Sequence, residues 1–234
     1  MNINVFKNEV LKMGISISDI QLKQLNEYYN LLIEWNNKIN LTGITNYEEV
    51  YLKHFYDSLT ICRVIDLNKE NSLVDIGTGA GFPGLVLKII FPQLQVDLID
   101  SLGKRIIFLQ DVVNKLNLQK INVINARAEE YAINHREEYD IVTARAVAPL
   151  NILLEYCLPL VKNRKYFISL KANCEQEISS IESALEKLKG KIIFLDKFQL
   201  PIEGSNRTII KIQKTDITPK KYPRRYSEIK KKAL

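Results

Sequence analysis

The sequence predicts an α/β fold, a mostly parallel, doubly wound sheet with an antiparallel finish and an N-terminal helical extension. From residue 72 onward, short apolar runs alternate with segments of helical periodicity, which is typical of βαβ units. A glycine-rich turn at 75–84 joins the first such strand to the first helix. The last two strand-like runs, 191–198 and 207–213, have no helical pattern between them. Because parallel neighbours need a long crossover connection, these two strands should pair antiparallel.

The first 70 residues predict helices and no strands. Ser18 and Gln21 form a capping box, and an apolar stripe runs from Leu25 to Ile39 at helical spacing. A second helix is expected over 47–64. We therefore divide the chain into three parts, which are a helical extension (1–70), a sheet domain (71–214) and a basic tail (215–234).

The sheet domain should contain five strands before the closing pair, at 72–76, 95–100, 121–125, 140–143 and 166–170. One helix is expected between Pro83, which suits a first turn, and Pro92, which stops it. The other helices are expected over 103–117, 150–161 and 178–188. Gly190 should end the last of them.

The glycine-rich turn predicts a nucleoside-binding site. It contains Gly77, Gly79 and Gly81, where backbone can approach a ligand closely because no Cβ is in the way. Asp100 closes the second strand, 19 residues beyond Gly81, and can accept hydrogen bonds from ribose hydroxyls. The order of the elements is typical of nucleoside-binding sheets, since a strand is followed by a glycine turn, a helix, a second strand and an acid.

The glycine spacing separates two classes of cofactor. A dinucleotide fingerprint counted from Gly77 places its third glycine on Phe82, and one counted from Gly79 starts late and contains Pro83. Asp75 at the strand end would repel a pyrophosphate but suits the amino and sulfonium groups of S-adenosylmethionine. With the antiparallel finish, these features predict the sheet of a class I methyltransferase that binds S-adenosylmethionine.

The composition is ordinary for a globular protein, with 46% hydrophobic and 26% charged residues in a chain of 234. No apolar run has the length of a signal peptide or a membrane span. Three widely spaced cysteines fit a reducing compartment and form no metal-ligand cluster. We therefore expect a cytoplasmic protein, a monomer, with no metal and no membrane partner.

The positive charge is concentrated in the tail. Residues 211–234 hold nine Lys and Arg against two acids, whereas the rest of the chain is nearly neutral. Lys220, Lys221, Arg224 and Arg225 alternate with tyrosines, which suits phosphates and nucleic-acid bases. The alternative is a solvated terminus with no partner. On charge alone, removing 218–234 should weaken RNA binding and spare cofactor binding.

Short blocks over most of the chain match one family. The most specific are Asp-Ser-Leu-Gly-Lys-Arg at 100–105 and Arg-Ala-Val-Ala at 145–148, and the others lie at 35–42, 54–59, 75–84, 127–130 and 218–224. On these blocks the chain resembles the bacterial small-subunit (16S) rRNA guanine-N7 methyltransferases, the RsmG family, also called glucose-inhibited division protein B. It departs from the family at Lys171-Ala172, where many relatives carry Lys-Gly, and at 226–229, which replaces a Gly/Pro-rich continuation.

The resemblance implies an S-adenosylmethionine-dependent enzyme that methylates N7 of a guanine in 16S rRNA, as free RNA or in the small ribosomal subunit. It implies that Gly77 and Phe82 line the cofactor site, that Ala128 and Glu129 lie near the adenine, and that Arg145 lies beside the site. Lys104, Arg105, Arg145 and Lys171 are candidates for contacts with RNA phosphates or the guanine edge. The modified nucleotide and the form of the substrate stay open.

The proposed chemistry needs no catalytic acid or base. Guanine N7 already carries an in-plane lone pair, so positioning the reactants is the main task of the enzyme. His135 lies in a polar stretch, and we interpret His54 as a structural histidine. Two alternatives stay open, an NAD-binding oxidoreductase and a non-catalytic RNA-binding, ribosome-associated factor. Cofactor titration separates the first from a methyltransferase, and a methyl-transfer assay separates the second.

Overall fold

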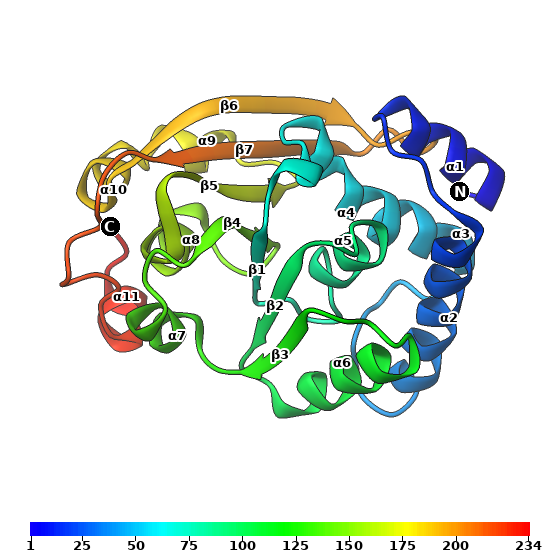
Figure 1. The fold of residues 1–234 in the computed structure, drawn as a ribbon. Helices are drawn as coiled ribbons and strands as arrows, with labels where there is room; N and C mark the ends of the chain where they lie inside the picture. Colours follow the sequence, from blue (N-terminus) through cyan, green and yellow to red (C-terminus); the bar gives the residue numbers. More distant parts are fainter.

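One seven-stranded sheet organises the computed structural model, which describes residues 1–234 (Figure 1). The strands are β1 (Ser72–Ile76), β2 (Gln95–Asp100), β3 (Ile121–Asn125), β4 (Tyr139–Arg145), β5 (Val161–Lys171), β6 (Gly190–Gln199) and β7 (Asn206–Lys214). Their spatial order is β3-β2-β1-β4-β5-β7-β6. The first five strands are parallel, and β7 is antiparallel to both β5 and β6. This confirms the predicted fold class and its antiparallel finish.

The strand order places a ligand crevice beside β1. This strand pairs with β2 on one side and with β4 on the other, so the chain connections diverge there. In open α/β sheets, ligands bind at the carboxyl ends of the strands around such a divergence. Both the glycine turn after β1 and Asp100 at the end of β2 lie at this edge.

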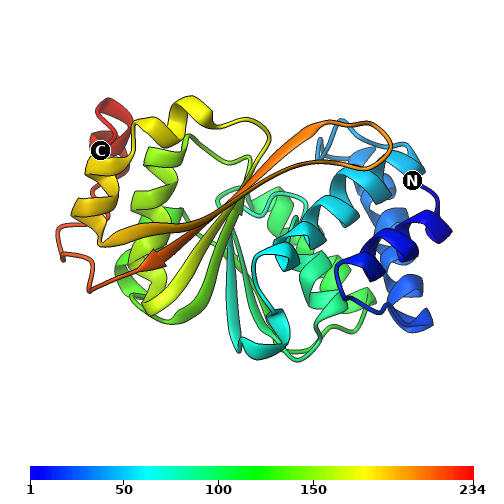
Figure 2. The ribbon, with the colours of Figure 1, turned by 90° about the horizontal axis from the view of Figure 1, so that it is seen from above.

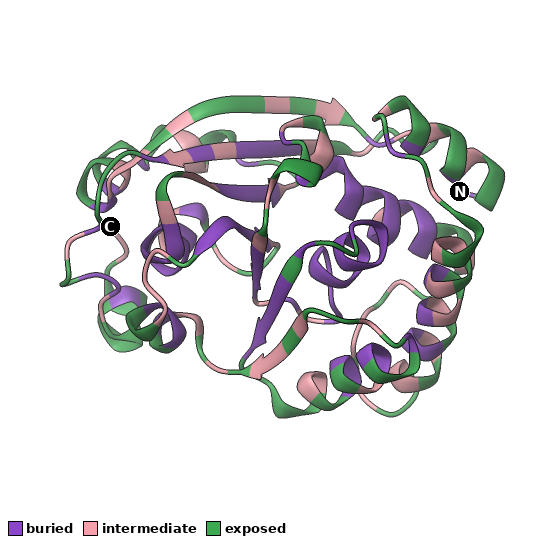
Figure 3. Ribbon diagram, in the orientation of Figure 1, coloured by how far each residue is buried: buried purple, intermediate pink, exposed green.

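Two apolar cores cover the two faces of the sheet, and Figure 3 shows the burial along the ribbon. The larger core contains side chains from α5 (Gly84–Ile90) and α6 (Gly103–Lys115). The smaller core contains side chains from α7 (Ala128–Asn134), α8 (Leu150–Cys157) and α10 (Glu182–Leu188). A short helix, α9 (Glu175–Ser179), precedes α10.

The N-terminal extension packs on the α5 and α6 side. Its first helix, α1 (Ile3–Lys12), was not expected from the sequence, while α2 (Asp19–Asn36) begins with the predicted capping box. Gln21 of that box also donates to two carbonyls at the end of α5, and Trp35 donates to Asp111 of α6 at 2.8 Å. Leu25 and Tyr28 belong to the larger core. The extension therefore shares its core with the sheet domain, and the division at residue 70 stays a prediction.

The helix predicted over 47–64 is a continuous helical segment with an irregular centre. It comprises α3 (Tyr47–Val50), a π-helical turn (Tyr51–Tyr56), α4 (Asp57–Leu59) and a 3₁₀ turn (Thr60–Arg63). The β6–β7 hairpin extends over this segment in Figure 2, and Arg63 pairs with Asp196 there at 2.5 Å. A π-helical turn inside a helix often marks a functional region.

Two predicted helix ends are wrong. The helix expected over 178–188 is divided into α9 and α10, and Lys189, with φ +63°, caps α10 in place of Gly190. Gly190 instead begins β6, where a Cβ would lie 2.8 Å from Leu158, so the glycine serves close packing. The helix expected over 150–161 ends at Cys157, because a 3₁₀ turn containing Pro159 follows and β5 starts at Val161.

The basic tail folds back onto the sheet domain and ends in α11 (Tyr226–Lys231), beside α7 (Figure 1). Arg136 donates to the carbonyls of Thr218 and Tyr222, and Arg224 pairs with the fully buried Glu155 at 2.7 Å. The reading of the tail as a solvated terminus is therefore wrong. None of the helices combines the length and hydropathy that a membrane span requires.

Candidate cofactor and substrate pocket

A cavity of about 730 Å³ lies at the carboxyl ends of β1 to β4. This volume is in the range of small-molecule sites. Residues after each of these four strands line it, and the N-terminal extension and the tail close its two sides. The lining includes seven of the eight predicted cofactor residues, which are Gly77, Gly79, Phe82, Asp100, Ala128, Glu129 and Arg145. Gly81 is the predicted residue that does not line it.

The glycine turn forms one wall of the cavity. Gly77 and Gly79 have φ of +66° and +62°, a backbone region that disfavours other residues. A Cβ on Gly79 would meet only a carbonyl oxygen at 3.9 Å, so this position opens onto the cavity. Gly81 has a different role, because a Cβ there would lie 2.7 Å from the hydroxyl of Tyr28 in the extension. It allows close packing of α2 against the turn.

Asp75 does not face the cavity, which contradicts the expectation that it meets cationic groups of a ligand. Its carboxylate is fully buried and accepts hydrogen bonds from Thr78 Oγ1 at 2.7 Å and from the Gly84 amide at 2.8 Å. Burial raises the pKa of Asp75 to about 7. The side chain therefore stabilises the glycine turn on the side away from the cavity, and its bond to Gly84 fixes the start of α5.

Asp100 presents a nearly complete set of hydrogen bonds at the cavity wall. Its oxygens accept from the Gly79 amide at 3.0 Å, the Leu102 amide at 2.9 Å and Arg105 Nη1 at 3.1 Å. A carboxylate has about four lone-pair sites, so about one is left for a ligand hydroxyl. Arg105 also lines the cavity, whereas Lys104 is exposed outside it.

The region after β3 forms the far end of the cavity, where α7 begins. Glu129 is buried, and Arg127 donates to it at 2.7 Å. The guanidinium of Arg127 lies 4.0 Å from the ring centre of Tyr226, so the tail contacts this end directly. Tyr226, Ile229 and Lys230 of α11 line the cavity beside Ala128 and Glu129.

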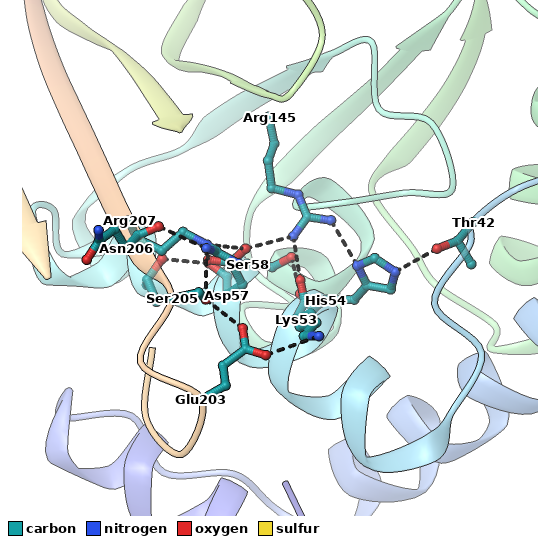
Figure 4. A network of polar contacts seen from close by, with 11 residues as sticks. Thr42, Lys53, His54, Asp57, Ser58, Arg145, Glu203, Ser205, Asn206 and Arg207 are labelled. Atoms are coloured by element: carbon teal, nitrogen blue, oxygen red, sulfur yellow. Dashed lines mark hydrogen bonds and ion pairs between the residues drawn. The ribbon is translucent and has the colours of Figure 1, made fainter. Parts of the chain in front are cut away.

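The opposite end of the cavity contains a network of buried polar side chains (Figure 4). Arg145 donates to the Lys53 carbonyl at 3.1 Å and lies 3.4 Å from both Asp57 Oδ2 and His54 Nδ1. Arg207 of β7 holds the same Asp57 carboxylate at 3.0 Å. These contacts join residues from the π-helical segment, β4 and β7 into one rigid cluster.

His54 is neutral in this cluster. Burial and the neighbouring Arg145 cation lower the pKa of His54 to about 3. Its Nδ1 faces the Arg145 donor, so Nε2 carries the hydrogen and donates to Thr42 Oγ1 at 2.9 Å. The imidazole ring stacks on the Phe82 ring with 4.4 Å between centroids, and the Arg145 guanidinium lies 5.1 Å from the centre of the Phe82 ring. The histidine therefore orients Phe82 and Arg145, in agreement with the structural role expected for it.

The cations proposed for RNA contact divide into two groups. Lys104, Lys220, Lys221 and Arg225 are exposed. By contrast, Lys171 donates to the Ala148 carbonyl at 2.8 Å and to Glu177 at 2.7 Å. Arg224 pairs with Glu155, and Arg105 pairs with Asp100 at 3.1 Å. Their contact with RNA stays a prediction for all of them, but the second group already has internal partners.

Sequence reasoning missed several residues of the cavity, namely Thr42, Arg127, Tyr226, Ile229 and Lys230. Thr42 lies in one of the blocks that carry the family resemblance, so that block was a usable signal. Nothing local marks Tyr226 or Ile229, because only the folded tail brings them to the cavity. No group of three or more His, Cys, Asp or Glu side chains is arranged to hold a metal ion.

Comparisons with known proteins agree with this geometry. The family model described as rRNA small subunit methyltransferase G matches residues 21–210. Proteins named ribosomal RNA small subunit methyltransferase G from Bacillus licheniformis and Bacillus subtilis are 50% and 49% identical over 228 residues, which cover 96% of this chain and 95% of each relative. A crystal structure of an S-adenosylmethionine-dependent methyltransferase from Aquifex aeolicus has a TM-score of 0.54 at 16% identity, over 77% of this chain and 97% of that one, and supports the fold alone. The chain belongs to the rRNA small subunit methyltransferase G family.

Proposed function

We propose that this protein transfers the methyl group of S-adenosylmethionine to N7 of a guanine in 16S rRNA. The observation that carries the proposal is the single cavity that joins the glycine turn and Asp100 to the cluster of His54, Phe82 and Arg145. One end has the features of a nucleoside site, and the other has those of a base site. Family membership supports the same reaction.

The residues at the first end fit the cofactor. Gly79 opens a cradle that a Cβ would fill, and Asp100 keeps about one acceptor site for a ribose hydroxyl. Ala128 and Glu129 follow β3 and suit the adenine. When bound, S-adenosylmethionine supplies a methyl group already activated by a sulfonium.

The residues at the second end fit a flat, neutral base. Phe82 is an apolar part of the cavity lining, and Arg145 is an always-charged donor held at a fixed place by Asp57 and the Lys53 carbonyl. An arginine can donate to guanine O6. We propose that Arg145 holds O6 and leaves N7 free to accept the methyl group.

The residues of the cavity promote the reaction by positioning the two reactants, and they need not transfer a proton. N7 carries an in-plane lone pair, so no proton has to leave before attack, and His54 is neutral and engaged on both ring nitrogens. Holding two reactants in line converts a bimolecular step into an effectively unimolecular one. The buried network around Arg145 provides the rigidity that this needs.

The exposed cations suit an RNA partner. Lys104, Lys220, Lys221 and Arg225 are free to contact phosphates, whereas Lys171 and Arg224 would act by holding the loop after β4 and the tail in place. We propose the cytoplasm as the site of the reaction, because rRNA is the proposed substrate.

The order and direction of the last strands argue against the oxidoreductase alternative. A dinucleotide-binding sheet continues with parallel strands after β5, whereas here the antiparallel β7 lies between β5 and β6. The non-catalytic alternative predicts an RNA-binding protein with no methyl transfer. It gives no reason for a cavity that brings together Gly77, Gly79 and Asp100.

The test is a transfer assay with S-adenosylmethionine labelled on the methyl group. The acceptors are 16S rRNA and small ribosomal subunits, each isolated from cells that lack this protein. We expect label in one of the two, on a guanine whose imidazole ring opens in mild base, as that of N7-methylguanine does while keeping its methyl group. Label at another atom would contradict the N7 assignment, and absence of label from both acceptors would contradict the enzyme.

A further inference from the structure

The tail reaches the cofactor end of the cavity with apolar and aromatic side chains. Tyr226, Ile229 and Lys230 all line the cavity, although charge alone suggested an RNA-binding role for this segment. They lie beside Ala128 and Glu129, the residues that suit the adenine. Figure 1 shows α11 packed next to α7, which begins with those two residues.

The tail is anchored well enough to act as a wall. Arg224 makes a two-pronged ion pair with Glu155, at 2.8 and 2.7 Å, and the Glu155 carboxylate is fully buried. Arg136 donates to the Tyr222 carbonyl at 2.6 Å. Ile229 itself is 1% exposed and belongs to the apolar core on this face of the sheet. These contacts fix the entry to α11 and one of its faces.

Tyr226 has the position of a stacking residue. The residue is 42% exposed although it lines the cavity, so a ligand in the cavity would cover surface that is now open. Arg127 lies over the ring at 4.0 Å and is itself held by Glu129 at 2.7 Å. The ring is thereby tied to the wall after β3. Aromatic faces stack on nucleic-acid bases irrespective of sequence.

We propose that α11 forms the adenine-side wall of the cofactor pocket, with Tyr226 and Ile229 in contact with the adenosyl group of S-adenosylmethionine. This rests on the proposed function for the identity of the cofactor. It reverses the expectation from charge alone, because loss of the tail now weakens cofactor binding.

The experiment measures binding of S-adenosylmethionine and of adenosine by calorimetry. The variants are Tyr226→Ala, Tyr226→Phe, a chain ending at Arg225, and Ser227→Ala as the matched control, because Ser227 is exposed on the same helix and does not line the cavity. Tyr226→Ala should weaken both ligands by the same factor, about tenfold. The shortened chain should weaken them at least as much, and Tyr226→Phe and Ser227→Ala should bind like the wild type.

The outcomes separate this inference from the function on which it rests. Unchanged affinity in both Tyr226→Ala and the shortened chain would overturn the inference while the function stands. Weaker binding of S-adenosylmethionine with unchanged adenosine binding would also overturn it, because the ring would then contact the methionine part. If the wild type binds neither ligand, the proposed function fails. An unchanged unfolding midpoint in Tyr226→Ala shows that lost affinity is local.

Discussion

The two ends of the cavity are built in opposite ways. At the base end, Arg145, His54, Asp57 and Arg207 are joined across sequence separations of up to 150 residues by buried polar contacts. At the adenine end, one wall is a six-residue helix at the end of the chain, anchored by Arg224, Arg136 and the buried Ile229. The base end is joined to several elements of the fold, whereas the tail wall depends on a few contacts near the end of the chain.

This difference assigns different tasks to the two ends. The rate of methyl transfer between two bound reactants falls when their alignment shifts slightly. A base site joined by many buried contacts keeps that alignment. A cofactor must enter and its product must leave, which favours a wall of low local stability. Changes at the base end should therefore alter global stability, and changes in the tail should alter binding alone.

The largest expected effect comes from Asp57→Ala. Its buried carboxylate serves both Arg145 and Arg207, so the substitution leaves two partly buried cations without their anion. Removing one partner of a buried ion pair costs about 3–5 kcal/mol of unfolding free energy. Denaturant unfolding measures it, and Glu34→Ala is the control because Glu34 pairs with Lys38 at the exposed surface of α2. An unfolding curve that stays in place would mean that the base end is not cross-braced as described.

Asp100→Ala removes a contact that lies between the two ends. The carboxylate is the proposed acceptor for the ribose, and charge-assisted hydrogen bonds are worth about 1.5–3 kcal/mol. Calorimetry should show affinity for S-adenosylmethionine lower by roughly ten- to a hundredfold. Glu130→Ala is the control, since Glu130 is an exposed acid on α7 that does not line the cavity. Equal affinities in the two variants would remove Asp100 from the site.

His54 should make the base end sensitive to acid. Its pKa of about 3 in the folded state lies below the ordinary value of 6.5, so the unfolded chain binds the extra proton first as the pH falls. The stability contribution is present above pH 6.5 and is lost between pH 6.5 and 3. Between neutral pH and pH 5, the unfolding free energy of the wild type should fall by about 2 kcal/mol more than that of His54→Asn. Unfolding curves of the two proteins measure it, and a constant difference between them from pH 7 to 5 would contradict a buried neutral histidine.

The smallest effect is expected from the exposed cations of the tail. A Lys220→Ala, Lys221→Ala double variant should keep its affinity for S-adenosylmethionine, since neither side chain lines the cavity. Each lost phosphate contact removes about 0.7–0.9 from the slope of log RNA affinity against log salt. Lys7→Ala on α1, at the other end of the molecule in Figure 1, is the control. Parallel salt slopes in all three proteins would place the RNA surface elsewhere.

Much of the sheet could be predicted because its signals are local. The strands at 72–76, 95–100 and 121–125 have the predicted bounds, since each is a short run with apolar residues that ends at a polar or turn-forming stretch. The antiparallel pair followed from a connection too short for a crossover. The glycine turn and Asp100 were recognisable because their spacing in the sequence determines their place in space.

The rest depends on the conformation of the glycine turn and on contacts between distant residues. The direction of the Asp75 side chain is set by Thr78 and Gly84, which take its oxygen away from the cavity. The place of the tail is set by Glu155 and Arg136, which are 69 or more residues away. From net charge alone, we interpreted residues 211–234 as one basic segment. In the fold, Lys214 is buried beside Glu137, and Arg224 is neutralised by Glu155.

The most direct test of the central claim is a map of methyl groups on 16S rRNA from cells with and without this protein. The account predicts one N7-methylguanine that disappears when the protein is absent and returns when the wild-type chain is supplied. An Arg145→Ala chain, which keeps the cofactor end and lacks the proposed guanine contact, should fail to restore it. Identical methyl maps in the two kinds of cell would contradict the account.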